Sequence, residues 1–459
     1  MEVTKKLAEF IVNTNYEDIP IEAIKEGKRC FLDGLGVILA GSRTKIAQII
    51  VEHIKELGGK PESTVLGFNL KTSCLNAALA NGTMAHADDY DDANRTTAGH
   101  PTAPVLPAIL AIGEREMLSG KEALLAYVLG YDVESRLGYS MNFSVHGEPL
   151  YLLRHTTGIL GTFGAATAAS KMLNLDEEQV INAFGISCSE ASGILRNNGT
   201  MTKSLHAGQA AENGLRAAIL AKKGYTTSDS CIEGEKGFAA TTLDECDFSK
   251  TIENLGSVFH ILEWPPGYKL YPCCMALAST IDRTLSLVKQ YDIHPNEVAE
   301  VRIGTTPRVA SFSKPYPKSG LEGKFSVEYV TALSILERKV VLEHFTDEKT
   351  HELWTRELMR KINVNIDPEL SKPGWILNKR LATKINVKLK NGKKYYRKIN
   401  YFKGEPVKEA PSVTDTELVS KFINCAKYAL SKKKIDESLN CIWNIEKISI
   451  KDLIETLQN

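Results

Sequence analysis

Apolar residues recur at helical spacing through most of the first 260 residues of the chain. From Ile21 to Leu39 they fall every three or four positions, after Pro20 and before Gly41, which are typical residues at helix boundaries. Helices of the same kind are expected at 45–57, 102–118, 121–137 and 201–221. The pattern therefore predicts an all-helical domain over residues 1–262.

The pattern changes after Pro265-Pro266-Gly267, a sequence typical of a boundary between structural units. Residues 297–304 and 362–366 alternate like strands, and Asn391-Gly392 is the turn typical of a β-hairpin. We expect a smaller α+β lid domain at 263–403. Helical periodicity returns over 404–459, and these helices are expected to pack on the first domain because they are too few to form a core. The predicted fold is mainly α.

Small residues form a stripe along the segment that follows His155. Gly158, Gly161 and Gly164 recur at helical spacing, which would let a neighbouring helix approach closely. No strand precedes them, so they do not form a dinucleotide-binding fingerprint.

Composition excludes several classes of protein. Lys and Arg together number 56, as do Asp and Glu, so the chain has no global field of the kind that nucleic-acid binders carry. No run approaches the roughly 18 apolar residues that a membrane span needs. Nine Cys residues without a Cys-x-x-Cys pair indicate a reduced, cytoplasmic protein without structural zinc or an iron–sulfur cluster.

Charged groups crowd into the stretch from His86 to His100. Four aspartates, at positions 88, 89, 91 and 92, lie between two apolar helical segments. Carboxylates against a core are costly unless they are paired, hydrated or functional. His100 precedes Pro101, which can open a helix whose positive end favours an anion. A solvated loop between two helices is the alternative interpretation.

Other proton-transfer or cationic groups lie at or near the predicted starts of elements. Lys203 is unusual because a cation near a helix start opposes the helix dipole. A site between two domains is a common arrangement. Alternatively His155 is a helix cap, Tyr329 a core tyrosine and Cys274 a small buried hydrophobe. The candidate groups are Arg154 with His155, Lys203 with His206, Lys269 with Cys273 and Cys274, and Tyr329.

Four segments resemble the MmgE/PrpD family, which includes 2-methylcitrate dehydratase, cis-aconitate decarboxylase and iminodisuccinate epimerase. They are His86-Ala-Asp-Asp-Tyr-Asp-Asp92 with Gly99-His-Pro-Thr-Ala-Pro104, His155-Thr-Thr-Gly-Ile-Leu-Gly161, Asn198-Gly-Thr-Met-Thr-Lys203, and Lys269-Leu-Tyr-Pro-Cys-Cys274. The resemblance implies a homodimer without cofactor or metal and a cleft between the two domains. It implies that the cleft holds catalytic Asp89, His100, His155, Lys203, Lys269 and Tyr329, with Arg154, His206 and Cys274 binding substrate.

Three positions depart from the family pattern. Cys274 stands where the decarboxylases have a histidine, five residues after the lysine that corresponds to Lys269. Ala93 stands where threonine is frequent, and Ala278 where many bacterial members have histidine. These differences weaken a particular decarboxylase assignment more than they weaken the family.

The residues and the resemblance together predict a cofactor-independent lyase. Lysines and histidines can bind a small di- or tricarboxylate, stabilise an enolate-like state and move a proton beside a carboxylate. We expect activity like 2-methylcitrate dehydratase or cis-aconitate decarboxylase. The alternatives are an epimerase of an imino- or amino-dicarboxylate and a non-catalytic carboxylate-binding relative.

A further alternative comes from the acidic stretch alone. Asp88, Asp89 and Asp92 fit the Asp-Asp-x-x-Asp pattern of isoprenoid diphosphate synthases, which bind magnesium through such carboxylates. Those enzymes need a second acidic cluster on a facing helix, and Asp367 and Asp415 do not supply one. The expected α+β domain also has no place in that fold.

Overall fold

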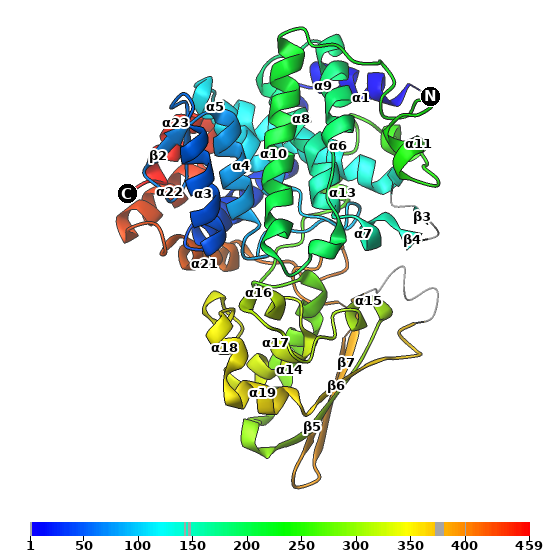
Figure 1. Ribbon diagram of the computed structural model, residues 1–459, viewed down its shortest axis with the longest axis vertical. Coiled ribbons are helices and arrows are strands. Elements are labelled where there is room, and N and C mark those ends of the chain that lie inside the picture. The colour runs from blue at the N-terminus through cyan, green and yellow to red at the C-terminus, as the bar shows by residue number, and fades with distance from the viewer. Residues whose placement is uncertain (1, 142–143, 146–147, 372–380, 400) are drawn as a thin grey trace.

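The computed structural model describes residues 2–141, 144–145, 148–371, 381–399 and 401–459. Helices predominate, and the strands form one four-stranded sheet and two short two-stranded sheets within this part of the chain. Figure 1 shows a large helical body above a smaller body that holds the larger sheet. The predicted fold class, mainly α with a smaller α+β part, is confirmed.

The large helical body contains the elements from α1 to α13. The helices are α1 (Val3–Asn13), α2 (Ile21–Gly41), α3 (Lys45–Leu57), α4 (Cys74–Ala85), α5 (Thr102–Arg115), α6 (Gly120–Met141), α7 (Leu150–Leu153), α8 (Thr156–Met172), α9 (Glu177–Glu190), α10 (Met201–Lys222), α11 (Phe238–Thr242), α12 (Ser249–Ile252) and α13 (His260–Glu263). The short strands β1 (Ser63–Val65) and β2 (Leu70–Thr72) form one hairpin, and β3 (Ser144–Val145) and β4 (Glu148–Pro149) form another.

The smaller body is built on a four-stranded sheet in the order β6-β5-β7-β8. Strands β5 and β6 are parallel, and the other neighbours are antiparallel. Residues of α14 and α17 share a buried core with this sheet. The elements are α14 (Ala278–Tyr291), β5 (Val298–Thr305), α15 (Pro307–Ala310), α16 (Gly320–Gly323), α17 (Val327–Leu336), α18 (Asp347–His351), α19 (Leu353–Met359), β6 (Ile362–Ile366), β7 (Thr383–Leu389) and β8 (Lys394–Ile399).

The last three helices pack on the large helical body. They are α21 (Asp415–Ala426), α22 (Lys432–Trp443) and α23 (Ile450–Thr456), drawn in orange and red near α3 in Figure 1. A Cβ atom at Gly36 of α2 would lie 3.3 Å from the Cα atom of Phe422 on α21, so the two helices approach closely. Their apolar residues share one core with those of α1 to α10.

Close packing among α5, α8 and α10 sets the geometry of the functional region. A Cβ atom at Gly161 on α8 would lie 2.4 Å from Pro104 on α5, and one at Gly214 on α10 would lie 2.5 Å from backbone atoms of α8. Only glycine permits these approaches, because any other side chain would push the helices apart. The starts of the three helices are therefore held near one another.

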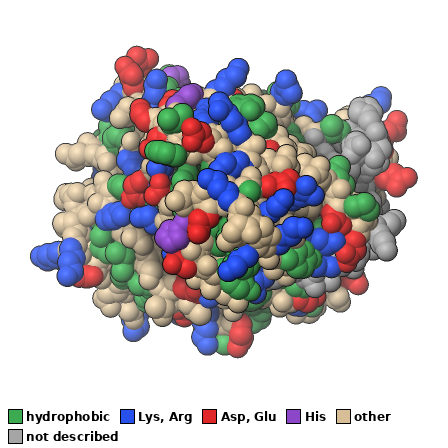
Figure 2. All heavy atoms as spheres, turned by 90° about the horizontal axis from the view of Figure 1, so that it is seen from below, with side chains coloured by type: hydrophobic (Ala, Val, Ile, Leu, Met, Phe, Trp, Pro, Cys, Tyr) green, Lys and Arg blue, Asp and Glu red, His purple; other side chains and the backbone are tan. Residues whose placement is uncertain are grey.

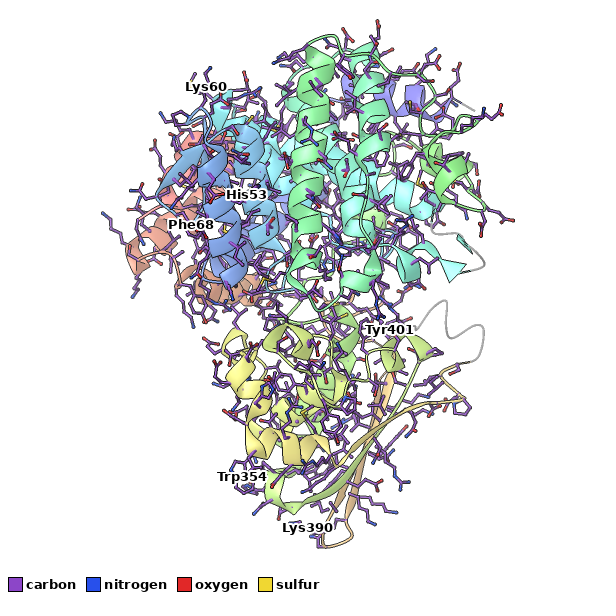
Figure 3. The ribbon with its side chains drawn as sticks, in the orientation of Figure 1. His53, Lys60, Phe68, Trp354, Lys390 and Tyr401 are labelled. Carbon is purple, nitrogen blue, oxygen red and sulfur yellow. The ribbon has the colours of Figure 1, made fainter. Side chains whose placement is uncertain are left out.

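The outer surface differs in character from this packed interior. On the face seen from below in Figure 2, basic and acidic side chains are interspersed. Figure 3 labels Trp354 and Lys390 at the end of the smaller body that lies far from the helical body. Among the described residues no single helix is long and apolar enough to cross a membrane, although α2 and α3 together pass that test as a bent pair.

Candidate active site

A cavity of about 50 Å³ is lined by residues of both bodies. A neighbouring cavity of about 100 Å³ shares part of this lining, including His100, Cys274 and Arg308. The polar and apolar groups around the first cavity include Asp89, His100, Arg154, His155, Asn198, Lys203, Cys274, Arg308, Phe312 and Phe325. Most of the residues predicted for the site are thus brought together from distant parts of the chain.

Three helix starts supply key side chains to this cavity. His100 lies two residues before α5, His155 is the N-cap residue of α8, and Lys203 lies in the first turn of α10. Unpaired N–H groups and the helix dipoles make such starts favourable places for an anion. The arrangement therefore favours a negatively charged ligand even before the lysines are considered.

Asp89 joins two lysines at the base of the cavity. Its Oδ1 atom lies 3.2 Å from Lys203 Nζ and 2.8 Å from Lys269 Nζ. Burial alone would raise the pKa of Asp89, but the two ammonium groups hold it well below its usual range. Burial would lower the pKa of Lys269, and Asp89 raises it. The carboxylate therefore stays ionised and fixes both lysines.

His86 connects this group to a second carboxylate. Its Nδ1 atom donates to Asp91 Oδ2 at 2.8 Å, and its Nε2 atom accepts a hydrogen bond from Lys203. Burial lowers the pKa of His86, which favours the neutral imidazole. His86 belongs to the acidic motif in the sequence but is not among the predicted site residues. Its spacing of three residues before Asp89 was the signal that could have identified it.

His100 presents an unprotonated nitrogen towards the centre of the cluster. Its Nδ1 atom donates to the backbone carbonyl of Asp92 at 2.7 Å, because a carbonyl can only accept. Burial lowers the pKa of His100 well below its ordinary value, so the ring is neutral. Its Nε2 atom lies 3.9 Å from Asp89 Oδ1 and keeps its lone pair. This geometry suits a general base.

His155 and His206 form a pair beside the same cavity. Their Nδ1 atoms are 3.0 Å apart, so one ring donates and the other accepts. Burial, and then the nearby Lys203, lowers the pKa of His155 well below its usual value, whereas burial and His86 lower that of His206 to about 4. His155 Nε2 is buried and has no hydrogen-bond partner among the described residues. That nitrogen is therefore placed to exchange a proton with a ligand.

The charges inside the cluster are balanced. The ammonium groups of Lys203 and Lys269 face the carboxylates of Asp89 and Asp91, while the buried imidazoles are neutral. Burial and the neighbouring Asp91 raise the pKa of Asp92 to about 8, so its carboxyl is protonated at neutral pH. A polyanionic ligand would consequently need additional cations, which the cavity lining provides as Arg154 and Arg308.

Arg308 is a cavity residue that is absent from the set predicted from the sequence. It lies on the four-residue helix α15 of the smaller body and lines both cavities. Its guanidinium carbon is 4.9 Å from the ring centre of Phe312 and 5.6 Å from that of Tyr151. No motif surrounds it, so only the folded chain shows that it faces the cluster.

Cys274 and Tyr329, two of the predicted site residues, differ in whether they line the cavity. Cys274 lines the cavity, and burial followed by the nearby Asp89 raises the pKa of its thiol, so it is a neutral wall residue. Tyr329 does not line the cavity: its hydroxyl donates to the carbonyl of His344 at 2.5 Å within the core of the smaller body. The placement of Tyr329 in the cleft needs correction, because a nearer backbone acceptor satisfies its hydroxyl.

Four side chains of the cluster have the kinds of donor atom that bind metal ions. His86, Asp89, Asp91 and His100 offer ligand atoms that all lie within 4.8 Å of one another. However, Lys203 contacts both His86 and Asp89, and Lys269 contacts Asp89, so a divalent cation would have to displace these ammonium groups. The donor set is already neutralised by lysine, and the expectation of a metal-free site stays a prediction.

Two sequence models of one protein family together match most of the chain. The sequence model of the MmgE/PrpD N-terminal domain matches residues 5–251, and that of the C-terminal domain matches residues 271–446. The chain belongs to the MmgE/PrpD family. Cis-aconitate decarboxylase from Homo sapiens is 27% identical over 465 residues, which cover 99% of this MmgE/PrpD protein and 94% of the human one.

Other relatives have related activities. Cis-aconitate decarboxylase from Aspergillus terreus is 22% identical over 99% of this chain and 96% of its own length. A probable 2-methylcitrate dehydratase from Saccharomyces cerevisiae is 27% identical over 48% of this chain and 45% of its own length. This MmgE/PrpD protein is a lyase of the type found in its family.

The three departures from the family pattern lie close together in space. Ala93 and Ala278 belong to one small apolar cluster with Met275 and Phe402. Ala93 and Met275 also line the 100 Å³ cavity, together with Cys274. This protein therefore presents an apolar wall beside its charged cluster.

Proposed function

We propose that this protein is a cofactor-independent lyase that acts on a small tricarboxylate, with decarboxylation of cis-aconitate as the first candidate reaction. The observation that carries the proposal is the cavity at which His100, His155 and Lys203 meet from three helix starts. Relatives that match nearly the whole chain have this activity, which supports the choice of substrate.

Binding relies on the arginines at the cavity. Because the lysines inside are neutralised by Asp89 and Asp91, the carboxylates of the substrate bind Arg154 and Arg308 through charge-assisted hydrogen bonds. The helix starts at His100 and His155 add a favourable potential. The reacting carbon is thereby held beside the imidazoles.

Decarboxylation then needs an electron sink and a proton. The bond between the carbon skeleton and one carboxylate breaks, carbon dioxide leaves, and the electron pair delocalises onto a remaining carboxylate. Although Asp89 offsets its net charge, Lys203 can still donate a hydrogen bond to that substrate carboxylate, and this stabilises the added charge in a buried site. The Nδ1 atom of His206 donates a hydrogen bond to His155 Nδ1, so the neutral His155 ring carries its proton on Nε2. As His155 delivers that proton to carbon, its Nδ1 atom takes the Nδ1 proton of His206, and the Nε2 atom of His206 takes a proton from solvent.

Dehydration of 2-methylcitrate is the second candidate, and the apolar wall favours it. Ala93, Met275 and Leu381 line the neighbouring cavity, which His100 also reaches, so an alkyl substituent has a suitable place there. In that reaction the Nε2 atom of His100 removes the proton beside a carboxylate. His155 protonates the departing hydroxide, so that water leaves and a carbon–carbon double bond forms.

The test incubates the purified protein with cis-aconitate, 2-methylcitrate, citrate and iminodisuccinate in heavy water, with products followed by NMR. We expect His155→Ala and Lys203→Ala to fold normally and to lose turnover. The matched controls His53→Ala and Lys60→Ala, on the outer surface of the helical body (Figure 3), should keep it.

Three other results would refute the proposed lyase activity or support one of its alternatives. Full activity of either site variant with an intact fold would refute the proposal. Deuterium exchange into iminodisuccinate without loss of carbon dioxide or water would support the epimerase alternative. Binding of tricarboxylates without turnover of any would support the non-catalytic alternative.

A further inference from the structure

The acidic loop is the segment 86–101 between α4 and α5, which carries the four aspartates. Three of its consecutive backbone carbonyls each accept a hydrogen bond from a different buried lysine. The donors Lys324, Lys269 and Lys421 are only 3%, 2% and 5% exposed. The three contacts are Lys324 Nζ to the carbonyl of Asp88 at 2.8 Å, Lys269 Nζ to that of Asp89 at 2.7 Å, and Lys421 Nζ to that of Tyr90 at 2.7 Å. We call these three residues the lysine cradle.

The cradle draws on three separate parts of the chain. Lys324 precedes α17 in the smaller body, Lys269 lies in the segment between the bodies, and Lys421 lies on the C-terminal helix α21. Lys324 also contacts Asp88 Oδ1 at 3.3 Å and the carbonyl of Pro272 at 3.2 Å. The acidic loop is thus held at once by the smaller body, by the segment between the bodies and by the C-terminal helix.

The loop needs such support because of its conformation. Asp89 has a φ of +50°, in the left-handed region that costs a non-glycine residue roughly 1–2 kcal/mol. A buried carbonyl without a partner costs about as much again or more. The cradle satisfies the carbonyls on both sides of Asp89, and so fixes the direction in which the Asp89 carboxylate points.

We propose that Lys421 and Lys324 are positioning residues for the reaction at this site. Neither contacts the cavity, but through the carbonyls that flank Asp89 they keep its carboxylate in contact with Lys203 and Lys269. The C-terminal helix and the smaller body therefore both determine the alignment of the charged cluster. The inference rests on the proposed function for its kinetic readout.

A purely structural role for Lys421 must be separated from positioning. Its Nζ atom also lies 2.6 Å from Asp33 Oδ1, and both side chains are buried. Lys421→Met leaves Asp33 without its counter-charge, whereas the double variant Asp33→Asn with Lys421→Met removes both charges. The double variant should regain thermal stability, because no uncompensated charge remains.

Kinetics of these variants give the decisive test. We expect Lys421→Met to lower kcat about 100-fold, which is the effect expected when catalytic groups are displaced by roughly 1 Å. KM should stay within about threefold of the wild-type value. The double variant should keep the low kcat, and Asp33→Asn alone should keep kcat within about threefold. Lys324→Met should lower kcat in the same way. Recovery of kcat in the double variant would overturn the inference for Lys421.

A matched control is Lys28, which also joins α2 to the C-terminal part of the chain. Lys28 on α2 donates to the carbonyl of Trp443 at 2.9 Å and pairs with Glu446 at 2.6 Å, away from the acidic loop. Lys28→Met should lower stability and leave kcat unchanged. An equal loss of kcat in this control would show that any loosened C-terminal contact suffices, and would overturn the inference.

A spectroscopic readout keeps the inference testable if the proposed function fails. The imidazole ¹⁵N signals of His86 and His100 report their contacts with Asp91 and Asp92. These signals should shift in Lys421→Met and not in Lys28→Met. If the wild-type protein converts none of the acids, the proposed function fails and the spectra alone decide the inference, which unchanged signals would overturn.

Discussion

Asp92→Asn should remove a loss of stability that the wild-type protein suffers as pH rises. Asp92 is fully buried, and its pKa of about 8 in the folded protein compares with 3.8 for an unperturbed group. Its Oδ1 atom accepts from the backbone N–H of Thr102 at 3.2 Å, and Oδ2 has no partner among the described residues. An amide keeps that acceptor and mimics the protonated carboxyl.

Proton linkage gives the direction and the size of this change in stability with pH. The pKa is raised on folding, so the contribution of this group is complete below pH 3.8 and is lost as pH rises through the folded value. Between pH 5 and pH 8 the unfolded chain has released the proton while the folded protein retains much of it. The unfolding free energy of the wild-type protein therefore falls by about 4 kcal/mol relative to that of Asp92→Asn over that interval.

The measurement is urea unfolding of both proteins at pH 5, 6.5 and 8. The difference in unfolding free energy should move progressively in favour of Asp92→Asn, and kcat at pH 6 should stay within about threefold, since His100 binds only the backbone of residue 92. The exposed Asp436→Asn on α22 serves as the matched control and should show no such trend. Parallel stability profiles for wild type and Asp92→Asn would refute the reasoning.

Two further substitutions test the assignments in the cavity. Arg308→Gln should raise KM for a tricarboxylate about 10- to 100-fold, the scale of one lost charge-assisted hydrogen bond, and should keep kcat within about threefold. Steady-state kinetics of this variant and of the exposed control Arg302→Gln test the prediction, and an unchanged KM would contradict it. Tyr329→Phe should lower stability by about 1 kcal/mol and leave kcat within about threefold, because its hydroxyl serves the carbonyl of His344. A loss of kcat above 100-fold with an intact fold would return Tyr329 to the catalytic group.

Local sequence features were enough to predict most elements of the fold. The Asn391-Gly392 turn joins β7 and β8, as expected for a hairpin, and β6 has the bounds that alternation predicted. Pro20 is the N-cap residue of α2 and Gly41 is its last residue, as expected for boundary residues. These features succeeded because hydrophobic period, caps and turn chemistry act within a few residues.

Some residues of the candidate site were also visible in the sequence, and others were not. His100, His155 and Lys203 stand in recognisable motifs at helix starts, and Asp89 stands in the acidic motif between α4 and α5. The structure brings all four to one cavity. Arg308 has no such context, and Tyr329 was misplaced because the backbone acceptor that satisfies its hydroxyl lies 15 residues further along the chain.

The sequence by itself determined the helical periodicity, the boundaries of the elements and the set of charged groups available for chemistry. Only the tertiary structure decided which charges compensate each other, because burial and distance set pKa values and neither can be counted along a chain. Two neighbouring aspartates illustrate this difference: Asp89 meets two lysines and stays ionised, whereas Asp92 meets mainly other carboxylates and keeps its proton.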